Sequence, residues 1–286
     1  MKEKKTALFW VLLQGVLTAA FTVGSKMAFN QGVDPLNFSA QILIVAGLIL
    51  LLILGFQRPG ELFKFNPGSL TTIFLAAFFG SGCFYALSFV GIKYSSAVNF
   101  GFLSQTCVVF TALLAYFLLK EKLTFYKLGL VLMLLLGCYL VSTGGSLMVP
   151  KIGDWLIVLG ALAFSLGVIA AKFGMRDVPP LFFSGYRALL GGLFLLAYLV
   201  VSGGFRPQIA WGWVLLVGGF VAFAILGINK TLELASASYV VMMSNLIPVF
   251  TVILAFLVLG EKMTAPQIIG GAVILASSIL CQWREA

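Results

Sequence analysis

Residues 95–124 read SSAVNFGFLSQTCVVFTALLAYFLLKEKLT, and residues 235–264 read ASASYVVMMSNLIPVFTVILAFLVLGEKMT. The two stretches align without a gap at an offset of 140 residues, and twelve aligned positions are identical, including Val109-Phe110-Thr111 with Val249-Phe250-Thr251. The motif Glu121-Lys122 also returns as Glu261-Lys262. Such self-similarity at a fixed offset indicates a duplicated unit. We therefore predict two repeats, residues 1–148 and residues 149–286.

The composition predicts a protein that spans a membrane. Hydrophobic residues make up 61% of the chain and charged residues 9%, whereas ordinary soluble domains are roughly a quarter charged. A helix of about 20 apolar residues crosses the hydrocarbon core of a bilayer, and we predict an all-α polytopic membrane protein with ten such helices. The predicted spans are Ala7–Ala28, Leu36–Phe56, Leu70–Gly91, Ala97–Leu119, Phe125–Gly144, Gly153–Gly174, Leu181–Ser202, Trp211–Thr231, Ala237–Leu259 and Pro266–Gln282.

The N-terminal apolar run is predicted to be the first transmembrane helix. It follows Lys2, Lys4 and Lys5, as a signal sequence would, but it is longer than the apolar region of a signal sequence. With the N-terminus inside, twelve Lys and Arg residues lie at cytoplasmic helix ends and five at outer ends. Positive charge favours the cytoplasmic side, so both termini are predicted to be cytoplasmic. The same bias explains the net charge of +9, and we expect no nucleic-acid partner.

A repeat of five helices has a structural consequence. Because five is an odd number, the second copy must enter the membrane in the opposite orientation to the first. Two inverted repeats can exchange roles around a site at their interface, which is the arrangement that secondary transporters use for alternating access. The sequence therefore predicts a central cavity between the two repeats.

The second repeat resembles a known family signature in four places. These are Ala235-Ser236-Ala237-Ser238, Pro248-Val249-Phe250-Thr251, Leu259-Gly260-Glu261-Lys262 and Ile269-Gly270. They are similar to the signature of the drug/metabolite transporter superfamily, and more narrowly of its bacterial ten-helix EamA-type branch. The first copy differs at Val108 and Lys120, where the second has Pro248 and Gly260. The resemblance implies a multi-pass metabolite transporter of the bacterial inner membrane, but not its substrate, because one fold serves many solutes.

Arg187 is the polar residue that we expect to matter most for function. It lies about two turns into the seventh predicted span, roughly 9 Å from its start. A charge at that depth is costly, and no acidic residue lies in the middle of any predicted span to pair with it. We predict that its guanidinium faces the cavity and binds a carboxylate or phosphate through two parallel hydrogen bonds. The alternative is that it extends to lipid headgroups or to nearby carbonyl groups.

Other polar residues inside the spans are candidates for lining the cavity. The fourth and ninth spans carry polar residues at equivalent positions of the repeats, namely Asn99 with Tyr239, Ser104 with Ser244, and Gln105 with Asn245. Further candidates are Gln41, Tyr85, Ser88, Tyr186, Asn229 and, near the end of the first span, Lys26. For the uncharged residues, the alternative role is a hydrogen bond between helices, worth about 1 kcal/mol.

Four residues are predicted to act in gating or in structure. Pro248 removes a backbone hydrogen bond inside the ninth span and predicts a hinge or a tolerated kink. Glu121 and its repeat equivalent Glu261 are predicted to cap the following helix or to pair with the adjacent lysine, and either could close a gate between loops. Lys172 lies near the end of the sixth span, where we expect it to reach the headgroup region.

The sequence lacks the usual sets of residues for catalysis or metal binding. It contains no His, and none of its nine Asp and Glu residues lies deep in a predicted span. A proton-coupled cation exchanger usually needs such an acid, so this mechanism is disfavoured. Cys83, Cys107, Cys138 and Cys281 show no metal-ligand spacing and are interpreted as reduced packing residues. We expect no catalytic residue, metal or cofactor.

These features predict a transporter that exports a small organic metabolite by alternating access and facilitated diffusion. An unpaired cation inside the membrane favours substrates with a carboxylate, such as amino acids or organic anions. The alternative substrates are neutral heterocycles, such as nucleobases or a vitamin, bound by the Asn, Gln and Ser residues. Outside transport, the alternative is a membrane sensor or a lipid-handling protein. The expected partners are the small-molecule substrate and the lipid bilayer, and the expected assembly is a monomer or a weak homodimer.

Overall fold

The computed structural model describes residues 2–285 apart from 65–66, 96, 207–209 and 261–262. The described residues form α1 (Lys2–Asn30), α2 (Pro35–Gln57), α3 (Pro67–Ala77), α4 (Phe84–Lys93), α5 (Ala97–Leu103), α6 (Cys107–Leu118), α7 (Phe125–Thr143), α8 (Asp154–Gly174), α9 (Pro180–Val201), α10 (Trp211–Leu234), α11 (Ala237–Ser244), α12 (Ile247–Leu259) and α13 (Ala265–Glu285). They also form two 3₁₀ turns, η1 (Pro59–Glu61) and η3 (Ser104–Thr106), and a π-helical turn, η2 (Phe78–Cys83).

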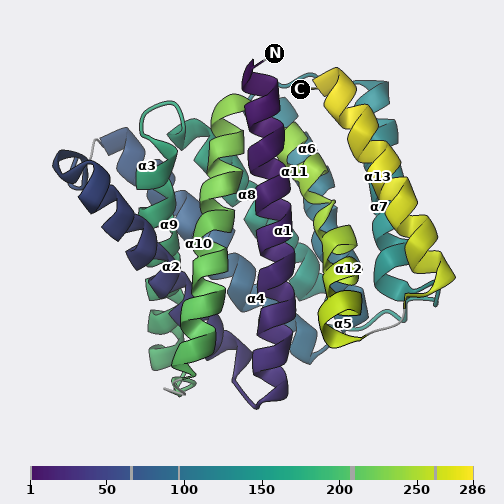
Figure 1. Ribbon diagram of the computed structural model, residues 1–286, viewed down its shortest axis with the longest axis horizontal. Coiled ribbons are helices and arrows are strands. Elements are labelled where there is room, and N and C mark those ends of the chain that lie inside the picture. The colour runs from purple at the N-terminus through teal and green to yellow at the C-terminus, as the bar shows by residue number, and fades with distance from the viewer. Residues whose placement is uncertain (1, 65–66, 96, 207–209, 261–262, 286) are drawn as a thin grey trace.

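The predicted all-α polytopic fold is confirmed in the described part of the chain. Nine helical stretches there are long and apolar enough to cross a membrane, and a shorter apolar helix, Ser104–Leu118, accompanies them. Together with the family membership reported below, these helices make the chain a multi-pass membrane protein. Figure 1 shows the helices as a bundle, with both ends of the chain at the same end of that bundle. We call this end the termini end and the opposite one the far end.

Helix boundaries follow from local capping groups. The Asp34 side chain accepts a hydrogen bond of 2.9 Å from the Asn37 backbone N–H at the start of α2, and Thr124 does the same for α7 through the Lys127 N–H at 3.2 Å. These acceptors satisfy N–H groups that have no partner within the helix. At the other end of α7, Gly144 has a left-handed conformation with φ 60°, which glycine adopts without steric cost.

Three of the predicted spans are interrupted rather than continuous. The third crossing contains the π-helical turn η2, and the fourth contains the 3₁₀ turn η3. The ninth is broken between α11 and α12 at Asn245–Leu246, immediately before Pro248 in the first turn of α12. The breaks in the fourth and ninth crossings fall at equivalent positions of the two similar stretches. Because Val108 stands where the ninth crossing has Pro248, the break in the fourth crossing does not depend on a proline.

The helices pack in a pattern that repeats after every five crossings. In the first half, α1 packs against α10 and α12 of the second half, and in the second half α8 packs against α3, α4 and α6 of the first. The helices of the second and seventh crossings, α2 and α9, pack against each other, as do α7 and α13 of the fifth and tenth. This is the packing that two equivalent units of five helices would give. Residues 1–148 and 149–286 as repeat boundaries remain a prediction.

Two glycines allow the third and sixth crossings to touch. Gly80 lies in η2 and Gly167 in α8, and a Cβ atom added at Gly167 would overlap the Gly80 backbone. No larger residue fits at this crossing without moving a helix, because backbone rather than flexible side chain fills the space. The close contact holds the π-helical turn against α8 and against the residue that α9 presents beside it, Arg187.

The two ends of the bundle differ in which of the described helices pack closely. At the termini end, α6 packs against α11. The equivalent pair at the far end, α5 and α12, is not among the closely packed helix pairs. Among the described residues, the close contact between equivalent helices is thus found at the termini end.

Candidate substrate site and gate

Arg187 lies inside the bundle in a network of side chains from α9 and α10. Only 3% of its surface is exposed. Its Nη1 donates to Asn229 Oδ1 over 3.4 Å. Asn229 Nδ2 in turn donates to Ser184 Oγ at 2.8 Å, and the Ser184 hydroxyl donates to the Pro180 carbonyl at 2.6 Å. Two predicted site residues, Arg187 and Asn229, are therefore brought together.

The charge of Arg187 is poorly compensated by the described residues. No carboxylate among them forms an ion pair with it, and its Nε has no hydrogen-bond partner there. A guanidinium has five N–H donors, and the single bond to Asn229 is long. Burying an unpaired charge costs several kcal/mol. The site therefore holds a cation with unused donors, which is the arrangement that an anionic group would stabilise.

The π-helical turn η2 closes one side of this site. A Cβ atom on Gly80 would lie 2.9 Å from Arg187 Nη2. A side chain at this position would therefore clash with the guanidinium. Tyr85, which follows η2 in α4, is close enough to interact electrostatically with Arg187. Single π-helical turns occur frequently at functional sites. The site is thus formed by α9, α10 and the third crossing.

Gly80 and Ser184 were not predicted as site residues from the sequence. Ser184 lies three residues before Arg187 and therefore on the same face of a helix, which is a signal that the sequence does contain. For Gly80 the only signal was the pair of glycines in Phe78–Cys83, and glycine inside an apolar span is equally typical of close helix packing.

Several of the other predicted polar residues connect neighbouring helices. Ser244 Oγ donates to Gln14 Oε1 in α1 at 3.3 Å, Asn245 Oδ1 accepts from Cys138 Sγ in α7 at 3.2 Å, and the Tyr239 hydroxyl donates to Gln282 Oε1 in α13. These contacts agree with the alternative role of hydrogen bonding between helices.

Asn99 has a structural connection at the far end of the bundle. Its Nδ2 donates to both Asp154 carboxylate oxygens, at 2.9 and 3.0 Å, and to the Val149 carbonyl at 2.9 Å. Ser95 Oγ also donates to Asp154. The start of the fourth crossing is therefore attached to the start of α8.

The remaining candidates lie at separate places. Tyr186 is directed toward η1, because its hydroxyl donates to the Leu62 carbonyl at 2.6 Å. Ser104 and Gln105 are half-buried in η3, Gln41 is half-buried in α2, Ser88 is buried in α4 and Lys26 is exposed near the end of α1. A role for these residues in binding substrate stays a prediction.

Glu121 reaches across the bundle to the first turn of α11. Its Oε1 accepts from the Ala237 N–H at 2.8 Å and its Oε2 from the Ser238 N–H at 3.3 Å. The sequence predicts that Glu121 caps the following helix, α7, or pairs with Lys122, but the side chain that caps α7 is that of Thr124. The reason is the left-handed backbone of Lys120, with φ 57°, which turns the chain after α6. The carboxylate complements the partial positive charge of the α11 N-terminus.

Lys172 stabilises the helix end next to this one. Its Nζ donates to the Leu232 carbonyl at 2.6 Å and to the Ala235 carbonyl at 2.7 Å, at the C-terminal end of α10. The prediction that it reaches the headgroup region stays a prediction, and the structure adds these two carbonyl partners at the end of α10. We call Glu121 and Lys172 together the α10–α11 clamp. The clamp lies at the termini end, where α6 and α11 are packed. Glu261, the repeat equivalent of Glu121, lies outside the described residues.

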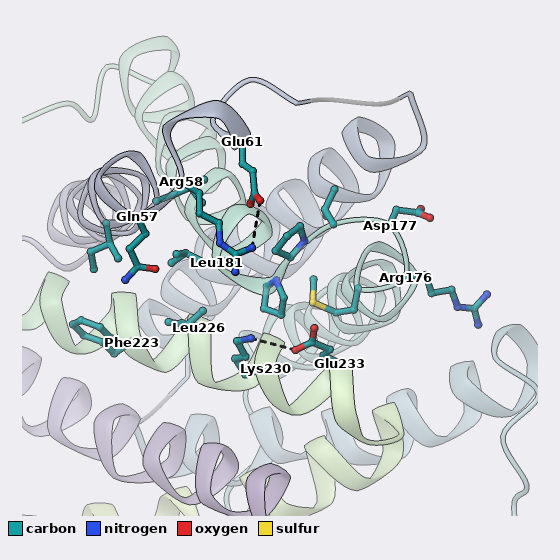
Figure 2. Close-up of a pocket in the computed structure, with 16 residues that line it drawn as sticks. Gln57, Arg58, Glu61, Arg176, Asp177, Leu181, Phe223, Leu226, Lys230 and Glu233 are labelled. Carbon is teal, nitrogen blue, oxygen red and sulfur yellow. Dashed lines mark hydrogen bonds and ion pairs between the residues drawn. The ribbon is translucent and has the colours of Figure 1, made fainter. Parts of the chain in front are cut away.

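A separate groove of about 680 Å³ lies at the termini end between α2, α9 and α10. Its wall contains residues of both charges, including the ion pairs Arg58–Glu61 and Lys230–Glu233, each at 3.3 Å. Figure 2 shows these pairs facing the groove. Arg176 and Asp177 also line it, but the ends of their side chains point outward. Arg187 is not among the residues that line the groove.

Comparison with known proteins assigns the chain to a family. A sequence profile of the EamA-like transporter family matches residues 5–143 and again residues 151–282. The chain belongs to the EamA-like transporter family. This confirms the resemblance to the drug/metabolite transporter superfamily seen in the sequence, and the chain is accordingly a membrane transporter of this family.

Individual relatives of this EamA-like transporter agree with the assignment. The uncharacterized transporter YyaM of Bacillus subtilis (strain 168) is 29% identical over 281 residues, which cover 91% of this chain and 90% of YyaM. A chloroplastic WAT1-related protein of Arabidopsis thaliana is 24% identical, covering 98% of this chain and 70% of that protein. A solved crystal structure superimposes with a TM-score of 0.78 at 17% identity and covers 98% of both chains, which shows that the fold is shared.

Proposed function

We propose that this EamA-like transporter moves a small organic solute with a carboxylate group, such as an amino acid or an organic anion, by alternating access. The observation that carries the proposal is the buried guanidinium of Arg187, with which no carboxylate among the described residues forms an ion pair. Arginine binds a carboxylate through two parallel hydrogen bonds, and such charged pairs are stronger than neutral ones. A solute that supplied the missing anion would relieve the cost of burying this cation.

The arrangement of the helices supports the alternating-access part of the proposal. In this proposal the α10–α11 clamp and the α6–α11 contact close the termini end, and the far end, where α5 and α12 are not among the closely packed pairs of described helices, is the end that opens. A second state in which the ends exchange roles would follow from the equivalence of the two halves. We further propose export by facilitated diffusion, because the sequence has no acidic residue deep in a span to carry a coupled proton.

Ligand-induced stabilisation of the purified protein tests the substrate class. The wild-type protein is heated in detergent with amino acids, organic anions, nucleobases, vitamins and organic cations, each supplied at about 1 mM. We expect carboxylates to raise the melting temperature and Arg187→Gln to abolish the increase, since glutamine keeps the polarity but loses the charge. Arg176→Gln, which removes an exposed arginine directed away from the groove, is the matched control and should respond like wild type.

The panel also separates the proposal from its alternatives. Stabilisation by neutral heterocycles or cations alone, unchanged by Arg187→Gln, would contradict a carboxylate site at Arg187. If Arg187→Gln does not fold, Arg187→Lys provides the same test, because a lysine keeps the charge but cannot form the paired hydrogen bonds. The lysine variant should bind carboxylates several-fold more weakly than wild type.

A further inference from the structure

The groove at the termini end is lined by apolar side chains, called here its apolar floor, and by charged side chains, called here its charged rim. Ile53, Leu181, Phe223 and Leu226 supply apolar side chains. Close by on the surface of α2, Leu52 and Phe56 are 61% and 87% exposed, as residues facing lipid are. The membrane-spanning stretches end or begin at Gln57, Gly174, Pro180 and Leu234. The groove therefore lies at the level where the hydrocarbon core gives way to lipid headgroups.

The charged rim is balanced rather than basic. Arg58 and Lys230 face the groove together with Glu61 and Glu233 (Figure 2). Each ion pair joins residues three positions apart, so neither pair fastens one helix to another. Exposed pairs of this kind contribute little to stability. Their charged groups are therefore available to a ligand at small cost to the fold.

Each of two walls of the groove presents a carboxylate beside a cation. Glu61, whose side chain is 30% exposed, accepts through Oε1 from Arg58 Nη1 at 3.3 Å. On the opposite wall, Lys230 Nζ donates to Glu233 Oε2 at 3.3 Å, and an ammonium group has three donors in all. The groove thus offers carboxylate acceptors and cationic donors on both walls.

We propose that this groove binds the headgroup of a zwitterionic phospholipid, phosphatidylethanolamine. Its phosphate accepts hydrogen bonds from Arg58 and Lys230, and its primary ammonium donates to Glu61. Its acyl chains extend along Phe223 and Leu226 toward the bilayer. A rim of equal positive and negative charge favours a zwitterion over an anionic lipid, and the partly exposed carboxylate of Glu61 favours a primary ammonium, which donates hydrogen bonds, over a choline, which does not. The proposal does not depend on the substrate that the transporter moves.

Lipid retention by the intact protein, measured by native mass spectrometry, tests the assignment. The protein is equilibrated with dioleoyl lipids that differ only in headgroup: phosphatidylethanolamine, phosphatidylcholine and phosphatidylglycerol. We expect phosphatidylethanolamine to be retained at least threefold more than either of the others. The double variant Arg58→Gln with Lys230→Gln should lose this preference, and Glu61→Gln should bring ethanolamine and choline lipids to equal retention. Arg206→Gln, which changes an exposed arginine that does not line the groove, should retain the wild-type preference.

Three results would overturn the proposal. Equal retention of ethanolamine and choline lipids by wild type would remove the role of Glu61. Strongest retention of phosphatidylglycerol would mean an anionic-lipid site. Competition by soluble phosphoethanolamine as effective as that of the lipid, at equal concentration, would show that the apolar floor contributes nothing and that the ligand is a water-soluble zwitterion. The residues changed are exposed or half-buried, so the variants are expected to fold.

Discussion

At the residue scale, equivalent positions in the two halves of the chain differ in backbone strain. Lys120 and Gly260 follow equivalent helices, α6 and α12, and both have left-handed conformations, with φ 57° and 68°. The conformation costs a residue with a Cβ atom about 1–2 kcal/mol, and glycine little. The first half therefore carries strain that the second half avoids, at the turn that directs Glu121 toward α11.

Replacing Lys120 with glycine is expected to stabilise the protein. Lys120→Gly should increase the free energy of unfolding by about 1 kcal/mol, because the steric cost of the left-handed conformation disappears and exceeds the entropic cost of a glycine. The measurement is the midpoint of thermal unfolding in detergent, which should rise. The opposite exchange, Gly260→Lys, is the matched control and should lower it by a similar amount. A fall in the midpoint of Lys120→Gly would contradict this account of the turn.

At the element scale, the short helix α11 is held at both of its borders by side chains from other crossings. The α10–α11 clamp places an anion at the N-terminus of α11 and a cation at the C-terminus of α10, which is the sense that both helix dipoles favour. Ser236 Oγ adds a local cap by accepting from the Tyr239 N–H at 3.1 Å. The position of α11 at the termini end therefore depends on a few charged hydrogen bonds and on the packing of α6 against α11.

Weakening the clamp should loosen α11 selectively. Glu121→Gln keeps one acceptor oxygen but loses the charge, and charged hydrogen bonds are worth more than neutral ones by roughly 1 kcal/mol. Hydrogen–deuterium exchange at the Ala237 and Ser238 amides should become about 5- to 10-fold faster, because exchange follows the local opening equilibrium. Glu233→Gln, at the same end of the bundle, should leave α11 unchanged. Equal protection of α11 in wild type and Glu121→Gln would show that the clamp does not hold the N-terminus of α11.

At the scale of the whole molecule, hydropathy was sufficient to predict the helical membrane fold. Apolar length indicates where a chain crosses a bilayer, and the family assignment agrees with that prediction. The interruptions were harder to see: Pro248 indicated the break in the ninth crossing, whereas the break at Ser104–Thr106 and the π-helical turn at Phe78–Cys83 have no proline. Such turns arise from packing between helices, as at Gly80 and Gly167, which hydropathy does not describe.

The candidate site was predictable only in part, for the same physical reason. Arg187 could be recognised from the sequence because a charge inside an apolar span is costly. Asn229 could be recognised as a polar residue inside another span. Which polar groups face one another depends on helix rotation and on the pairing of helices. The partners of Asn99, Glu121 and Lys172 are distant in sequence, at Asp154, Ala237 and Leu232, so their contacts could not be derived from the order of residues.

Flux through reconstituted vesicles tests the central claim most directly. Wild type, Arg187→Gln and Arg176→Gln are reconstituted into liposomes loaded with the radiolabelled carboxylate that stabilises the wild-type protein most strongly. We predict saturable efflux down the concentration gradient for wild type and Arg176→Gln, and a loss of at least tenfold at subsaturating substrate for Arg187→Gln. Efflux by Arg187→Gln at the wild-type rate and with the wild-type KM would contradict the claim that this buried guanidinium binds the transported carboxylate.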